Sequence, residues 1–138
     1  MNRPIKFRVW DKITNQYLQE LGIYYWHIPY SLDGEEITGE ANLVGLSELL
    51  KHDNFVTQQY TGLTDSNDNP IYEGDILKIS YGTMGDVIGQ VLYEADEGGY
   101  IFQWERKGPN QHHINLNCDV AFESVIVGNI FEHSELLK

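Results

Sequence analysis

Apolar and polar side chains alternate along several stretches of this chain, with the period of a half-buried β-strand. Near the start, Ile5, Phe7 and Val9 occupy every second position, and a polar turn follows them. The chain then resumes with aromatic and β-branched residues, which favour strands. We therefore predict a β-hairpin over residues 4–28.

The spacing of apolar residues then becomes helical. A polar, acidic stretch over residues 29–42 predicts a loop, and Asn42 or Ser47 could cap a helix that follows it. Four leucines recur there at helical spacing: Leu43, Leu46, Leu49 and Leu50. We predict one short helix here, followed by a strand over residues 55–60.

The second half of the chain shows shorter and more regular alternation, interrupted by glycine-rich turns. It contains four candidate strands: 76–81, 87–94, 100–105 and 121–127. Short strands joined by glycine turns are typical of a small curled barrel, so we predict an SH3-like β-barrel. The fold class predicted for the whole chain is mainly β with a minor α contribution.

The length of 138 residues is near the commonest size of a single domain, and 41% of the residues are hydrophobic. A chain of this kind can bury a core without metal or disulfide. We predict one domain over residues 1–138. A division into a hairpin-plus-helix subdomain, 1–58, and a barrel subdomain, 59–138, is left open.

Charge narrows the choice of partner. The chain has 9 basic and 21 acidic side chains, a formal charge of −12, and residues 13–77 carry eleven acids with Lys51 as their only Lys or Arg. Such a field repels phosphate backbones, which disfavours direct nucleic-acid binding. It attracts a basic protein surface, or serves solubility alone.

Cys118 is the only cysteine, so no intrachain disulfide forms and a reducing cytoplasm is the expected compartment. The alternating N-terminus has no apolar signal region, and no apolar run reaches the roughly 20 residues that span a bilayer. We expect no membrane association.

The stretch YTGLTDSNDNPIYEGDIL, residues 60–77, resembles the signature of the YopX family. The N-terminal IKFRVWD and the C-terminal VIVGNIFEHSELL are also similar to that family, so the resemblance spans the whole chain. One departure is the turn Asp68-Asn69-Pro70, where the family more usually has an Asn-Gly pair. The resemblance implies phage or prophage origin, a host bacterial cytoplasm, a mostly β fold and no established activity.

Residues 60–77 are the candidate recognition surface, because aromatic rings and carboxylates would gather at one end of the barrel. The candidate binding residues are Tyr60, Gly62, Asp65, Tyr72, Glu73, Gly74 and Asp75. Turn chemistry explains the same segment more simply. Aspartate and asparagine bond their own backbone in Asx turns, glycine permits positive φ, and proline fixes φ.

Glu73 and Asp75 stand two residues apart, a spacing that places two carboxylates on one face of a strand. No neighbouring residue is an obvious partner for acid–base chemistry, and no other nucleophile or phosphate-binding motif occurs. We therefore expect no enzymatic activity and no catalytic residue.

His112, His113, Cys118 and Asp119 are ligand types for zinc. Adjacent strand residues point to opposite faces, and the spacing matches no zinc motif. We expect a loop with incidental histidines, a buried cysteine, no metal and no cofactor.

These observations predict a non-enzymatic phage or prophage accessory protein that acts as a protein-interaction module with an acidic surface. The alternative is a nucleic-acid-binding SH3-like barrel that uses the N-terminal basic residues and the edge from Trp104 to Lys107. Against this alternative, Trp10 and Trp104 are expected as core or edge residues of the sheet. Assembly of several copies through aromatic edge strands is left open.

Overall fold

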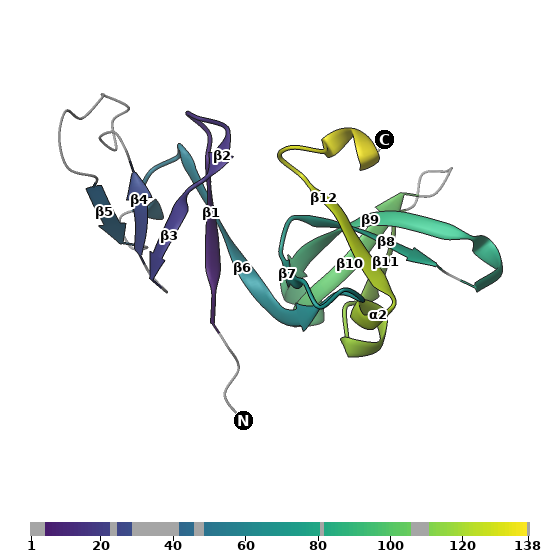
Figure 1. Cartoon of the computed structure of the whole chain (residues 1–138). Helices are drawn as coiled ribbons and strands as arrows, with labels where there is room; N and C mark the ends of the chain where they lie inside the picture. Colours follow the sequence, from purple (N-terminus) through teal and green to yellow (C-terminus); the bar gives the residue numbers. More distant parts are fainter. Residues whose placement is uncertain are drawn as a thin grey trace. The chain divides into compact units, whose positions relative to one another are not determined.

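The computed structural model describes residues 5–22, 25–28, 42–45, 49–80, 82–105 and 111–137. Contacts divide the chain into an N-terminal unit, Met1–Gln59, and a C-terminal unit, Tyr60–Lys138. The boundary falls within one long strand, β6 (Figure 1). The prediction of a mainly β fold is confirmed.

The N-terminal unit is built from two small antiparallel sheets. Their strands are β1 (Phe7–Asp11), β2 (Gln16–Tyr17), β3 (Gln19–Gly22), β4 (Tyr25–Ile28), β5 (Asn42–Gly45) and β6 (Phe55–Thr64). Strand β1 lies between β2 and the first half of β6, with Trp10 opposite Tyr17 and Val56. Strand β4 lies between β3 and β5.

The single hairpin predicted over residues 4–28 is therefore two strand pairs, β1 with β2 and β3 with β4. The other edge of β1 pairs with β6, which lies far along the chain. No local sequence pattern indicates this pairing. Val9 and Trp10 are both buried in this unit. The alternation near the start of the chain predicted the burial of Val9.

The prediction that a helix begins near Leu43 is wrong, because Asn42–Gly45 forms strand β5, in which Leu43 lies opposite His27. Strand pairing with β4 supplies backbone hydrogen bonds that a short isolated helix would have to provide alone. Leu49 is helical and buried, while residues 46–48 and most of the predicted 29–42 loop lie outside the described residues.

The C-terminal unit contains a five-stranded antiparallel sheet in the order β11-β10-β9-β8-β12, and β7 pairs with the end of β6. Its strands are β7 (Pro70–Tyr72), β8 (Asp75–Ser80), β9 (Asp86–Glu94), β10 (Gly99–Glu105), β11 (Gln111–Asn115) and β12 (Ser124–Asn129). Its helical elements are η1 (Gly82–Met84), η2 (Ala95–Glu97), α2 (Cys118–Phe122) and η3 (Ser134–Leu137).

Three predicted strands coincide with β8, β9 and β10, and the fourth begins at Ser124, because residues 118–122 form α2. Strand β11 lies in a polar stretch that predicted a loop. Its residues pair with β10 through backbone hydrogen bonds, which do not depend on apolar side chains. Hydropathy alone therefore could not reveal it.

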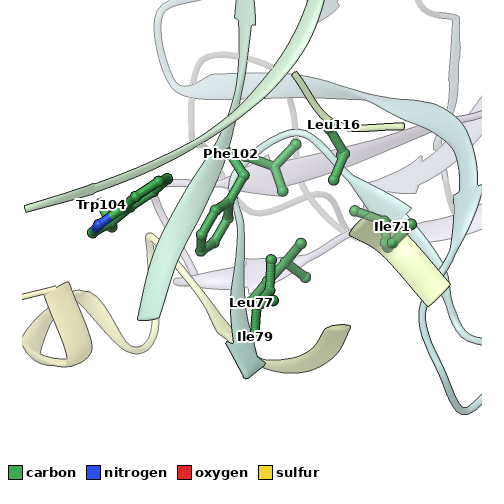
Figure 2. Packing of buried hydrophobic residues seen from close by; sticks show 8 residues of the cluster. Ile71, Leu77, Ile79, Phe102, Trp104 and Leu116 are labelled. Atoms are coloured by element: carbon green, nitrogen blue, oxygen red, sulfur yellow. The ribbon is translucent and has the colours of Figure 1, made fainter. Parts of the chain in front are cut away.

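The main core of the C-terminal unit lies on the inner face of the five-stranded sheet. Its buried members are Ile71, Leu77, Ile79, Val91, Phe102, Trp104, Leu116 and Ala121. Figure 2 shows Phe102 and Leu77 projecting into the same interior. Gly89 makes room for this packing, because a β-carbon there would lie 2.8 Å from the Phe102 ring.

The five-stranded sheet curls into a half-barrel, so the closed SH3-like barrel stays a prediction. Over the residues that the structure covers, no helix combines the length and the apolar character needed to cross a membrane.

Candidate functional site

Asp65, in the turn between β6 and β7, joins two distant parts of the C-terminal unit. Its Oδ1 accepts hydrogen bonds from the backbone N–H groups of Asn67 and Asn69, each at 2.9 Å. Its Oδ2 accepts the N–H of Ile126 in β12, at 3.0 Å. Ser66 adds a backbone bond to Ser124. The turn therefore holds the edge of the sheet.

The Asp65 side chain is only 3% exposed, and burial by itself raises its pKa. The hydrogen bonds from Ile126, Asn69 and Asn67 favour the charged form and outweigh burial, so the pKa lies below the usual 3.8. The buried carboxylate stays ionised because three N–H groups surround it.

The second turn of the segment, between β7 and β8, is organised in the same way. Asp75 is buried, and its Oδ2 accepts the backbone N–H of Tyr72 at 2.8 Å. Gly74 has φ +86°, donates its N–H to Val91 and accepts the N–H of Ile130. Glu73 is half-buried beside it. Glu73 and Asp75 therefore lie on either side of Gly74 in a turn. Their spacing in the sequence instead predicted that the two carboxylates share one face of a strand.

The two tyrosines of the predicted site are cross-strand neighbours. Tyr60 on β6 lies opposite Tyr72 on β7, and their ring centroids are 5.7 Å apart. The pairing shifts register between Tyr60 and Thr64, where Gly62 has φ +88°. Thr61 donates its hydroxyl to the Ile71 carbonyl at 2.8 Å and fastens the two strands.

The structure thus gives most of the predicted binding residues a structural use. Gly62 and Gly74 take up positive φ, Asp65 and Asp75 hold backbone N–H groups, and the turn interpretation accounts for these four. The binding role of the segment stays a prediction. Its two buried carboxylates already have protein partners.

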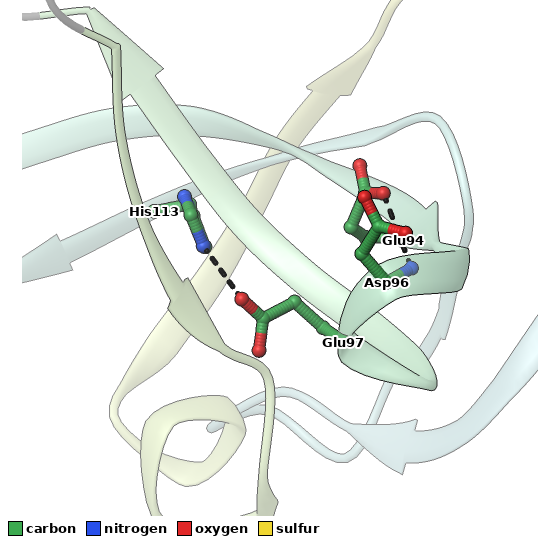
Figure 3. A network of polar contacts seen from close by, with 4 residues as sticks. All are labelled: Glu94, Asp96, Glu97 and His113. Carbon is green, nitrogen blue, oxygen red and sulfur yellow. Dashed lines mark hydrogen bonds and ion pairs between the residues drawn. The ribbon is translucent and has the colours of Figure 1, made fainter.

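The histidines of the rejected metal site point apart. His112 stacks on Trp104 with centroids 5.8 Å apart, while Nε2 of His113 lies 3.2 Å from Oε1 of Glu97 (Figure 3). Both lie on β11, not in the predicted loop. Across the residues described, no three side chains of metal-binding type gather. Cys118 is exposed at the start of α2, so the prediction that it is buried is wrong.

Trp104 is 9% exposed and also stacks on Phe102, with centroids 5.5 Å apart. Of the two expected locations for Trp10 and Trp104, the core and a sheet edge, the structure shows the core, because both residues are buried. A tryptophan that is buried and packed against two other rings offers little surface on which a nucleobase could stack. Arg106 and Lys107, which complete the proposed nucleic-acid edge, lie outside the described residues.

A small cavity that sequence reasoning missed lies between α2 and the inner face of the curled sheet. Its volume is about 130 Å³, and its lining residues are Ile79, Ile114, Asp119, Val120 and Glu123. Ile114 belongs to edge strand β11, and Ile79 belongs to β8, beside the opposite edge strand β12. Because the sheet curls, both reach the same cavity. We call it the α2 cavity.

Helix α2 is fixed at both ends. At its start, Oδ1 of Asn117 accepts the N–H of Val120 at 3.0 Å. At its end, the Ser124 hydroxyl donates to the Ala121 carbonyl at 2.7 Å, and Ala121 is buried in the core. Asparagine is a preferred N-cap residue, so Asn117 was the local signal for this helix.

Two comparisons show what this chain is similar to, and a third finds no match. The sequence model of the family described as YopX protein matches residues 6–138. The solved structure titled "Crystal structure of protein EF1440 from Enterococcus faecalis" is similar with a TM-score of 0.57 and 20% sequence identity, over 99% of this chain and 100% of that chain. This likeness concerns the fold alone. No curated protein matches the chain.

Proposed function

Since this chain belongs to the YopX family, we propose that it is a non-enzymatic accessory protein that acts as an interaction module for a basic protein partner. The charge of the C-terminal unit carries this proposal. Residues 60–138 hold thirteen of the 21 acidic side chains but four of the nine basic ones. A phage or prophage origin and a bacterial cytoplasmic location complete the proposal.

Most of these carboxylates face solvent. The exposed ones among the described residues are Asp68, Asp86, Asp96, Glu97, Asp119, Glu123, Glu132 and Glu135. Lys78 is the one Lys or Arg of this unit within the described part, and its Nζ lies 3.2 Å from Asp86. The Ser80 hydroxyl and Lys78 lower the pKa of Asp86. A surface on which acidic side chains outnumber basic ones steers basic partners to itself.

The use of Asp75 supports a non-enzymatic role. A general acid or base needs a carboxyl that can reach a substrate proton. The Asp75 carboxylate is instead buried and holds the Tyr72 N–H. The Glu73–Asp75 pair therefore has a structural explanation that requires no reaction.

The proposal is tested by pulldown from a bacterial lysate with the full chain at about 50 mM and about 500 mM salt, since raised salt screens surface charge. A comparison variant carries Asn or Gln at the exposed carboxylates. We expect basic proteins to bind the native chain at low salt and to be released at high salt. We expect them not to bind the variant. Identical retention by both chains would reject a charge-driven interaction.

The nucleic-acid alternative is decided by a gel-shift titration at low ionic strength, where phosphate contacts are strongest. The acidic C-terminal unit and the stacked position of Trp104 favour no shift. A shift at low salt would make nucleic acid the partner.

A further inference from the structure

We propose that the α2 cavity is the point where this protein binds an arginine side chain of its basic partner. This inference rests on the proposed function and specifies its contact site. The cavity combines an aliphatic wall with two carboxylates, one on α2 and one on the residue after it, and that combination matches the two chemically different parts of an arginine side chain.

The aliphatic wall is formed by Ile79, Ile114 and Val120. Apolar cavities of about 150 Å³ hold a benzene molecule, so the 130 Å³ found here accommodates the three-carbon stem of arginine. Burial of that stem removes apolar surface from water on both partners. A bare cation would gain nothing from this wall.

The two carboxylates belong to Asp119, in the first turn of α2, and to Glu123, the residue that directly follows the helix, and both line the cavity. Both side chains are exposed, and within the described part of the chain no hydrogen bond or ion pair involves either carboxylate group. A guanidinium group offers five N–H donors in a rigid plane, so it can bond both carboxylates at once. The negative charge of the same two carboxylates repels phosphate groups.

Phe122, on the same turn of α2, is 75% exposed. Large aromatic side chains are enriched in protein interfaces, and a guanidinium also stacks on an aromatic face. The cap by Asn117 and the buried Ala121 hold α2 in place. Binding therefore costs little conformational entropy in this helix. The helix and the residue after it thus present a ring and two charges from a rigid support.

The test measures binding of labelled octaarginine to the full chain by fluorescence anisotropy at about 50 mM salt. The double variant Asp119→Asn, Glu123→Gln is expected to bind about tenfold more weakly, because it loses both ion pairs. The matched control is Glu132→Gln, Glu135→Gln, which removes the same charge from exposed positions elsewhere. We expect the control to change affinity less than about twofold.

Amide signals in NMR spectra locate the peptide independently. Those of Ile79, Ile114 and Val120 should shift on titration, and Phe122→Ser should weaken binding without loss of folding stability. Equal weakening by the double variant and its control would overturn the cavity site and leave the proposed function intact. Absence of octaarginine binding would also overturn the site, and the salt-dependent pulldown would then decide the function separately. An oligonucleotide that shifts the same amides would overturn the assignment to a protein partner.

Discussion

The carboxylate of Asp65 accepts the backbone N–H of Ile126 at 3.0 Å, across 61 residues of sequence. Asp65 also closes its own turn through Asn67 and Asn69. One buried side chain therefore joins the β6–β7 turn to strand β12 at the edge of the main sheet. The stability of the C-terminal unit should depend strongly on it.

Asp65→Asn should lower the free energy of unfolding by about 2 kcal/mol, because an amide has one acceptor oxygen and turns an N–H donor toward one of the three backbone donors. Urea unfolding of both chains measures the difference. The control is Asp68→Asn in the same turn, exposed and at φ +64°, which asparagine tolerates. The control should stay within about 0.5 kcal/mol of native. Equal losses would show that the hydrogen bonds of Asp65 are not responsible.

Acid should remove the contribution of Asp65. Its pKa is below 3.8 in the folded chain, so the unfolded chain binds the proton more readily. The contribution is complete above the unfolded value of 3.8 and is lost as the pH falls through the lower folded value. Urea unfolding of native and Asp65→Asn chains at several pH values from 7 to below 3 gives the comparison. The two stabilities should converge in acid, and a constant gap would contradict the assignment.

Gly89→Ala should destabilise the C-terminal unit by about 3 kcal/mol. A β-carbon there would lie 2.3 Å from the backbone oxygen of Gln103 and 2.8 Å from the Phe102 ring, so backbone would have to move. Gly99→Ala is the matched control on the neighbouring strand, because its β-carbon would meet nothing within 4 Å. Thermal unfolding should separate the two variants clearly. Similar melting temperatures would refute the close packing.

Asn117→Ala should cost about 1 kcal/mol of stability, because the Val120 N–H loses its capping oxygen. It should also weaken octaarginine binding, since α2 carries Asp119 and leads directly into Glu123. Asn117→Asp keeps an acceptor oxygen and should retain both properties. Urea unfolding and anisotropy titration provide the two readouts. If the Ala and Asp variants behave alike, the cap does not position the helix.

The sequence determined those features that depend on near neighbours. Alternation and glycine turns were enough for β8, β9 and β10, and the Asx turn at Asp65 forms from residues two and four positions away. Periodicity and turn propensity act over a few residues, so the chain itself displays them.

Tertiary structure alone decided the features that depend on distant partners. Leu43 lies in a strand because β5 pairs with β4 through backbone hydrogen bonds. The polar residues of β11 form a strand because they pair with β10 in the same way. The α2 cavity likewise needs Ile79 and Ile114, which only the curl of the sheet brings together. Backbone pairing and close packing join residues far apart in the chain, and no local pattern records which partner will be near.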